Sequence, residues 1–436
     1  MKAKQKKEIF LSRLFLHLDG IAIIPTILAL ENKKIISKFK TSSLSEMSKK
    51  YNANEAYLNV ALRLLCSQGL LEQDIRDNGE IYFTKKNNNI TKRIEIYSLA
   101  KDLYEKNIDY SILCKNQNIL NTTLFHIISD FIKKYRKNIE KDIFWYHVEG
   151  AIIAPIIVEL ARKGYFQNIT NTITNLKQLH PPIKKIIEDL FICTQILDQN
   201  KVITDFGQFI LNRCTSYGVT VSYLPTFKNI THLIFGNHKL LWTKKGEPEK
   251  HVNRKINVWG SGGAHNTYFK KIDKIIIDLF NLPIKKQPQG FIDVGCGNGK
   301  FIEHVFQLIC TKTKRGMQLD KYPLTIIGCD YNQKAIEVTQ QNLKKANINV
   351  KTIIGDISEP RLIAQSIQEK HQIKLENLLN IRSFLDHNRI YHASQKKIKQ
   401  KIKSSGAFCK QGERIENNAL QQNFKDHLEK WIPYLK

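Results

Sequence analysis

Three glycines at alternate positions, Gly295, Gly297 and Gly299, could bring backbone amides close to a bound ligand. They follow the apolar run 291–294, which is typical of a buried parallel strand, and they precede apolar residues at helical spacing over 301–309. A strand, a glycine turn and a helix present a ligand site at the carboxyl end of the strand, because glycine permits close approach and positive φ. A tight turn without a ligand would use the same residues, so the motif alone leaves both interpretations open.

Acidic residues end the next two expected strands. The apolar run 324–329 ends at Asp330, and the run 350–354 is followed by Gly355 and Asp356. In nucleotide-binding βαβ units an acid at the end of the second strand accepts hydrogen bonds from ribose hydroxyls. Asp356 could accept one from an adenine amino group. With a fourth strand expected over 377–382, the pattern predicts an α/β, Rossmann-like domain with a bound ligand.

The motif Asp293-x-Gly295-x-Gly297-x-Gly299 with its later strand-end acids resembles the class I S-adenosylmethionine-dependent methyltransferases. Two further segments, 258–265 (VWGSGGAH) and 382–389 (RSFLDHNR), resemble methyltransferases associated with polyketide synthases, and the likeness covers most of the chain. The resemblance implies S-adenosylmethionine as the cofactor and a glycine-rich loop at 258–268 that touches it. The cofactor contacts that it implies are Asp293, Gly295, Cys296, Gly297, Gly299, Asp330, Tyr331, Asp356 and Ile357.

The resemblance also implies a carbon acceptor, an activated β-keto or malonyl thioester that loses its α-proton before or during transfer. His387, just after the fourth strand, is the first candidate for the base or for contact with the enolate, and His265 is the second. Asp386 could orient an imidazole, although neighbours on an extended chain point apart. A lone histidine is more often a structural hydrogen-bonding group. The same three residues could instead hold a divalent metal that polarises the enolate.

The composition of the chain indicates the cellular compartment of such an enzyme. The chain has 436 residues, 42% of them hydrophobic, and a formal net charge of +28. No apolar run reaches the roughly 18 residues of a membrane span, and a secretory leader is not evident. The eight cysteines stand without C-x-x-C pairs, so we expect a reduced, cytoplasmic protein. Lysines spread along the whole chain beside many Ile and Asn residues, which favours a compositional bias over a nucleic-acid surface.

Two similar units are expected before the glycine motif. In the first, helices lead to a hairpin over about 70–84, the order typical of a winged-helix unit. The pattern His17-x-Asp19-Gly20 with Pro25 recurs as His147-x-Glu149-Gly150 with Pro155, at a constant offset of 130 (150 − 20, 155 − 25), which indicates an internal duplication. The expected domains are a winged-helix-like unit over 1–95, a helical connector over 96–141, a second such unit with a cavity-lining linker over 142–257, and the methyltransferase domain over 258–436.

Three functions remain open. The favoured one is C-methylation of a small molecule or of an acyl group on an acyl carrier protein, with the winged-helix units enclosing substrate or forming a homodimer. A nucleic-acid (RNA) methyltransferase is the alternative, but the expected recognition helix over 55–68 carries only Arg63. The segment 380–383 also lacks the Asn/Asp-Pro-Pro-Tyr/Phe signature of amino-methylating enzymes. A non-catalytic regulator or scaffold is the third, and the intact glycine motif argues against it.

The implied fold has seven strands in the order 3-2-1-4-5-7-6, whereas only four are expected here before a helix over about 417–431. The sequence therefore predicts a methyltransferase domain that is incomplete after strand four, with that strand as an edge open to pairing with another chain. On this expectation the isolated chain binds the cofactor poorly or modestly. It would turn over slowly unless a second polypeptide supplies the remaining strands.

Overall fold

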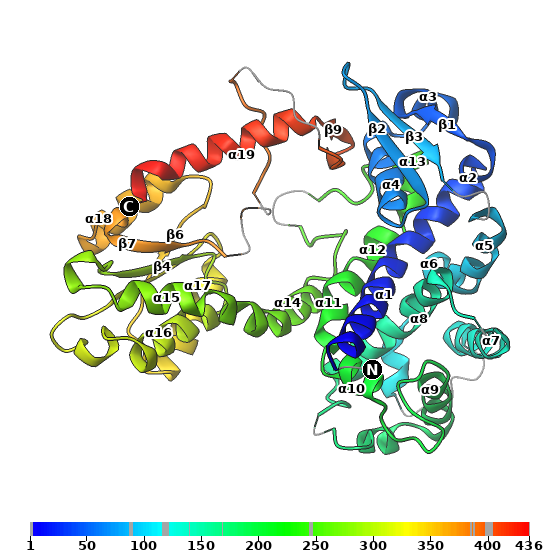
Figure 1. The fold of residues 1–436 in the computed structure, drawn as a ribbon, viewed down its shortest axis with the longest axis horizontal. Helices are drawn as coiled ribbons and strands as arrows, with labels where there is room; N and C mark the ends of the chain where they lie inside the picture. The colour runs from blue at the N-terminus through cyan, green and yellow to red at the C-terminus, as the bar shows by residue number, and fades with distance from the viewer. Residues whose placement is uncertain are drawn as a thin grey trace. The chain divides into compact units, whose positions relative to one another are not determined.

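The computed structural model describes residues 3–86, 90–115, 122–138, 140–167, 169–243, 247–383, 386, 389–396 and 404–435. The chain forms two compact units, shown in Figure 1. The first contains residues 1–264 and 403–415, and the second contains residues 265–402 and 416–436. The segment 403–415 therefore returns to the first unit after most of the second has been traced.

The first unit is mainly helical. Its helices are α1 (Ala3–Asn32), α2 (Ile35–Lys38), α3 (Leu44–Tyr51), α4 (Glu55–Ser67), α5 (Ile90–Tyr97), α6 (Lys101–Glu105), α7 (Thr123–Lys137), α8 (Ile143–Arg162), α9 (Pro181–Cys193), α10 (Asp205–Leu211), α11 (Cys214–Ser222), α12 (Leu224–Phe227) and α13 (Ile230–Phe235). The segments expected as three domains, 1–95, 96–141 and 142–257, all contribute to one hydrophobic core. The division of this unit into separate domains stays a prediction.

A small antiparallel sheet accompanies α3 and α4. Its strands are β1 (Thr41–Ser43), β2 (Leu71–Ile75) and β3 (Ile81–Lys85), in the order β1-β3-β2. Ser43 and Glu46 form a capping box that begins α3, and Gly79 takes the positive φ of the β2–β3 turn. This is the predicted winged-helix arrangement. In the second copy the hairpin reduces to one antiparallel bridge, Leu197 to Ile203, between α9 and α10.

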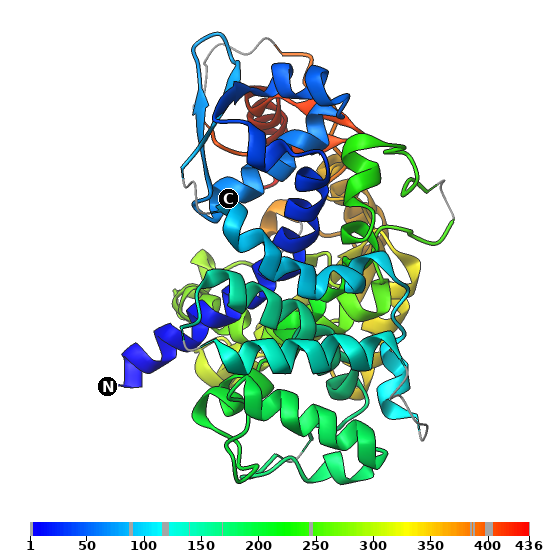
Figure 2. The same ribbon diagram turned by 90° about the vertical axis from the view of Figure 1, so that its right-hand side faces the viewer.

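The repeated His-x-acid-Gly motif marks the point where α1 and α8 cross. A Cβ on Gly20 would lie 2.2 Å from His147 O, and a Cβ on Gly150 would lie 2.2 Å from His17 Cα. Glycine is therefore required at both positions for the two backbones to meet. α1, drawn in blue, runs diagonally through the first unit in both views (Figures 1 and 2).

Helices α1 and α8 also meet the length and apolarity of membrane spans, over Lys4–Asn32 and Ile143–Arg162. Their apolar windows are 61% and 83% buried inside the protein. Two such helices packed against each other are typical of the core of a globular unit.

The second unit is a doubly wound α/β structure. Four parallel strands, β4 (Gly290–Val294), β5 (Thr325–Asp330), β6 (Lys351–Ile354) and β7 (Leu378–Ile381), lie in the order β6-β5-β4-β7. Apolar residues of α15 (Asp273–Phe280), α16 (Lys300–Lys312) and α17 (Gln333–Lys345) cover one face. Residues of α18 (Pro360–His371) and α19 (Asn417–Trp431) cover the other. The Rossmann-like prediction is confirmed, and within the described part of the chain β7 is an edge strand paired with β4 alone.

Two segments differ from the sequence-based expectations. The glycine-rich stretch 258–268, expected as a loop, belongs to helix α14 (Arg254–Phe269). Gly260 serves packing, since a Cβ at this position would lie 2.6 Å from Val219 N of α11. An unexpected hairpin, β8 (Phe408–Lys410) and β9 (Glu413–Ile415), packs on α4.

Candidate active site

The glycine loop after β4 has a backbone that other residues rarely adopt. Gly295, Gly297 and Gly299 have φ values of 90°, 56° and 78°, in the left-handed region that favours glycine. The amides of Gly295 and Cys296 donate to Cys329 O at 2.7 and 3.0 Å, which ties the loop to the end of β5. Gly299 then precedes the first turn of α16, whose amide dipoles favour negative or polar ligand groups.

Asp330 ends β5 and closes the other side of this loop. Its side chain is 8% exposed. Oδ2 accepts from Gly297 N at 3.1 Å, and Oδ1 accepts from Asn332 N at 2.9 Å. Because each carboxylate oxygen has two lone-pair directions, the ionised group keeps capacity to accept hydrogen bonds from ligand hydroxyls.

Asp293, in β4, is a buried acid with an unsatisfied oxygen. It is 2% exposed, and its Oδ1 has no hydrogen-bond partner among the described residues. Burial and the nearby negative charge of Asp330 raise the pKa of Asp293 to about 7. An orphaned carboxyl beside a second carboxylate is costly for the protein alone. It fits a ligand that brings a positive charge or a hydrogen-bond donor to this point.

The remaining predicted cofactor residues divide into two groups. Asp356 lies at the same carboxyl edge, where its Oδ1 accepts from Ser358 N at 2.8 Å and the preceding Gly355 N donates to Asp330 O. Tyr331 adjoins Asp330 and its side chain is 77% exposed. The side chains of Cys296 and Ile357 instead pack in the two cores beside the sheet. Burial raises the pKa of the Cys296 thiol to about 12, so this cysteine is a neutral packing group.

Asp386 has a histidine partner that the sequence analysis missed. His427 of α19 lies with its Nε2 2.8 Å from Asp386 Oδ1, and the histidine is 4% exposed. Burial lowers the pKa of His427 despite the opposing effect of Asp386. The two residues stand 41 positions apart (427 − 386), so no local spacing could have revealed the pair. His387 and the side chain of His265, the two predicted candidates, lie outside the described residues.

The Asp386–His427 pair belongs to the same edge of the sheet as the glycine loop. Asp386 follows β7, which pairs in parallel with β4, so the carboxyl ends of both strands meet at one edge. A groove of about 320 Å³ runs beside β7 in the second unit. It is lined by Leu379 and Ile381 of β7, Ile275 and Ile276 of α15, and Phe301 of α16. The groove is mostly apolar and would accommodate an acyl group.

A metal site is not formed by the residues that the structure describes. No group of three or more His, Cys, Asp or Glu side chains among them could hold an ion. The predicted option of a metal on His265, Asp386 and His387 falls largely on side chains outside this description, and it stays a prediction.

Three family models match the chain. A methyltransferase model described as the AprA MT2-like domain covers residues 249–436. Models of the AprA N-terminal domain and the AprA winged helix domain cover residues 10–73 and 149–237. Together they account for most of both units. A search of curated proteins found no match.

Proposed function

The chain belongs to the AprA-like family of polyketide synthase-associated methyltransferases, and from that premise we propose that it methylates the α-carbon of an acyl thioester. A methyltransferase of this class generally takes its methyl group from S-adenosylmethionine. The acceptor would be a β-keto or malonyl-type group on a carrier protein or on a small molecule. The observation that carries the cofactor part of the proposal is the buried Oδ1 of Asp293, which has no partner among the described residues and lies beside Asp330 at the glycine loop.

The residues at the loop fit S-adenosylmethionine, which supplies an electrophilic methyl group when it is bound. Asp330 would accept hydrogen bonds from the ribose hydroxyls, as strand-end acids do in nucleotide sites. The buried oxygen of Asp293 would face a cationic or N–H group of the same ligand. The glycine turn leaves the space above the backbone free of Cβ atoms, so that the ligand can lie against it.

The Asp386–His427 pair would remove the acceptor's α-proton. Asp386 accepts from His427 Nε2, which fixes the tautomer with the proton on Nε2 and leaves Nδ1 as the base. The lowered pKa of His427 keeps the imidazole neutral at physiological pH, the form that can take a proton. The C–H proton would move to Nδ1, and its electron pair would remain on the acceptor as an enolate.

The first winged-helix unit supports a small-molecule or carrier-bound substrate over nucleic acid. In the nucleic-acid alternative α4 would enter a groove, but α4 is contacted by the β8–β9 hairpin. Arg63, the basic residue of α4, donates to Ser405 O, and Arg414 Nε lies 2.9 Å from Glu55 Oε1. A helix engaged in this way has little surface left for a duplex.

The decisive assay offers the purified chain S-adenosylmethionine with acetoacetyl or malonyl thioesters, and in parallel with tRNA and DNA. We expect a methylated thioester, found by mass spectrometry, and no methylated nucleic acid. His427→Gln should slow transfer about 10²–10⁴-fold, the usual worth of a general base. His304→Gln is the matched control, since His304 Nε2 also contacts an aspartate, Asp273, at 2.7 Å.

Methylation of RNA or DNA with no thioester product would contradict the proposed acceptor. Equal loss of rate in the His427 and His304 variants would remove the base role from His427. In that case the effect would be one of general stability.

A further inference from the structure

An apolar cavity of about 210 Å³, partly open to solvent beside Val60, lies in the first unit between α1, α4, α12 and α13. Its walls include Ala22 of α1, Ala61 and Leu64 of α4, Phe227 of α12 and Leu233 of α13. The described atoms that face the interior include no nitrogen or oxygen. The cavity is separate from the glycine loop and from the groove beside β7, because none of its wall residues belongs to the second unit.

Two threonines in the wall keep their hydroxyl groups out of the cavity. Thr26 Oγ1 donates to Ala22 O at 2.7 Å, and Thr226 Oγ1 donates to His251 O at 2.7 Å. Their methyl groups remain to line the interior. An ordered water needs polar partners, and the described wall atoms supply none, so the cavity is suited to an apolar occupant.

The volume of the cavity indicates the size of the group that it can hold. For comparison, an engineered apolar cavity of about 150 Å³ binds benzene. A volume of about 210 Å³ therefore has room for a group somewhat larger than a benzene ring.

The β8–β9 hairpin provides a cover on one side. Cys409 of β8 contributes to the wall, while the hairpin is tied to α4 by polar contacts outside the cavity. Asn54 Nδ2 donates to Gly412 O at 3.0 Å, and Arg414 pairs with Glu55. Ion pairs with this much solvent exposure contribute about 0–1 kcal/mol. Because the cavity is already partly open to solvent, a ligand can enter it without displacing the hairpin.

We propose that this cavity binds a small uncharged hydrocarbon group, of the size of an alkylated benzene ring or a short branched alkyl chain, under the β8–β9 hairpin. The inference does not rest on the identity of the methyl acceptor. It places a ligand site in the first unit, in addition to the cofactor site of the second unit.

Toluene is the probe for this site, with phenol as its polar counterpart. Toluene should bind the full chain saturably and raise the thermal unfolding midpoint, because a ligand that binds only the folded state stabilises it. Phenol should bind at least several-fold more weakly, since its hydroxyl would lose its water partners. Toluene should also slow the alkylation of Cys409 but not of Cys310 in the second unit, as followed by peptide mass spectrometry.

Two variants fill the cavity. Val60→Phe adds volume at the solvent-exposed side of the cavity, and Ala61→Leu adds volume at its buried wall. Each should weaken toluene binding at least tenfold. Val338→Phe is the matched control, because Val338 is also a partly exposed helical valine but lies in α17 of the second unit. The proposal is overturned if toluene shows no saturable binding, if both folded cavity variants bind it like the wild type, or if Cys409 and Cys310 are protected equally.

Discussion

Asp293 shows how one buried side chain connects cofactor binding with pH. Its carboxyl group has almost no contact with solvent, one oxygen lacks a described partner, and Asp330 repels its negative charge. In the ligand-free protein the pKa of Asp293 is therefore about 7. A cationic group that approaches Oδ1 would favour the ionised form and lower this pKa again. Binding of such a ligand and loss of a proton are coupled.

This coupling predicts the pH dependence of cofactor affinity. S-adenosylmethionine should bind more tightly as pH rises from 6 to 8, by up to about tenfold per pH unit below the pKa, and the affinity should level off above it. Asp293→Asn should bind more weakly and lose this dependence. Titration calorimetry at pH 6, 7 and 8 measures both effects. An Asn variant that keeps the wild-type slope would assign the titration to another group.

The stability of the ligand-free protein should change in the opposite direction. The folded-state pKa of Asp293 lies above its unfolded value of about 3.8, so its contribution to folding is fully present below that value. The contribution is lost as pH rises through about 7. In urea unfolding without ligand, Asp293→Asn should therefore become more stable relative to the wild type between pH 5 and 8. A difference that is constant over this range would contradict the prediction.

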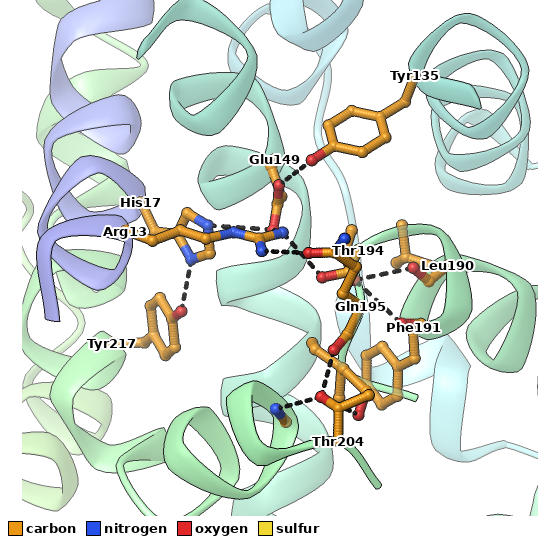
Figure 3. A network of polar contacts seen from close by, with 12 residues as sticks. Arg13, His17, Tyr135, Glu149, Leu190, Phe191, Thr194, Gln195, Thr204 and Tyr217 are labelled. Carbon is orange, nitrogen blue, oxygen red and sulfur yellow. Dashed lines mark hydrogen bonds and ion pairs between the residues drawn. The ribbon is translucent and has the colours of Figure 1, made fainter. Parts of the chain in front are cut away.

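At the scale of elements, the α1–α8 pair shows what the repeated motif is for. Figure 3 shows Arg13 and His17 of α1 meeting Glu149 of α8 in the interior. Arg13 Nη2 lies 2.5 Å from Glu149 Oε1, and Tyr135 donates to Oε2 at 2.6 Å. Burial alone would raise the pKa of Glu149, but Arg13 and His17 hold it below its ordinary value. The two histidines of the motif also have tyrosine partners. His17 Nδ1 lies 2.7 Å from the hydroxyl of Tyr217, and His147 Nδ1 lies 2.6 Å from the hydroxyl of Tyr97.

Removing the charge of Glu149 should test this network. Breaking a buried pair leaves its partner uncompensated, so Glu149→Gln should cost roughly 3–5 kcal/mol of unfolding free energy. Glu359→Gln is the control, because Glu359 pairs with Lys430 at the surface, where half of each side chain is exposed, and should cost about 0–1 kcal/mol. Urea denaturation at neutral pH gives both values. Equal costs would mean that burial does not set the strength of the network.

Substitution of the glycines where α1 and α8 cross should also lower the stability of the protein. Gly20→Ala places a Cβ 2.2 Å from a backbone oxygen, which cannot move without shifting α8. We expect a loss of about 1–3 kcal/mol, the usual cost of overpacking, or more. Gly262→Ala in α14 is the control, because its Cβ would meet nothing within 4 Å and alanine is the better helix former. Similar thermal stability of the two variants would contradict close packing at Gly20.

Most elements that local patterns describe were predictable from the sequence, the short β8–β9 hairpin being an exception, and those that depend on distant partners were not. Strands β4 to β7 and the glycine turn follow from apolar runs that end in Gly or Asp. The helix over 254–269 was missed because glycine is typical of loops, so the sequence around Gly260 favoured a loop. In the structure Gly260 allows close packing of the helix against α11. His427 was missed because its partner Asp386 is brought to it only by the sheet and α19. The constant offset of 130 residues did reveal the motif, but not that its two copies meet.

At the scale of the whole molecule, the net charge of +28 is the property most relevant to partners. Many of the described lysines already pair with acids on the surface, such as Lys201 with Glu188 and Lys430 with Glu359. Each such pair neutralises one lysine, but the net charge of the whole chain remains +28. A chain with this excess would attract an acidic protein over distances comparable to the Debye length, even without one concentrated basic patch.

This attraction predicts a salt effect that depends on how the acceptor is presented. If the acceptor reaches the enzyme on an acidic carrier protein, kcat/KM for the carrier-bound thioester should fall steeply as salt rises. The Debye length shortens from about 10 Å at 0.1 M to about 3 Å at 1 M, and electrostatic steering is lost with it. The same acyl group on free pantetheine carries little charge, so its kcat/KM should change much less. Measuring both substrates with one enzyme preparation separates docking from salt effects on the methyl-transfer site itself. Parallel decline of the two rates would show that the positive charge does not serve carrier docking, and a carrier-bound thioester that reacts no faster than the free one would remove the carrier from the proposal.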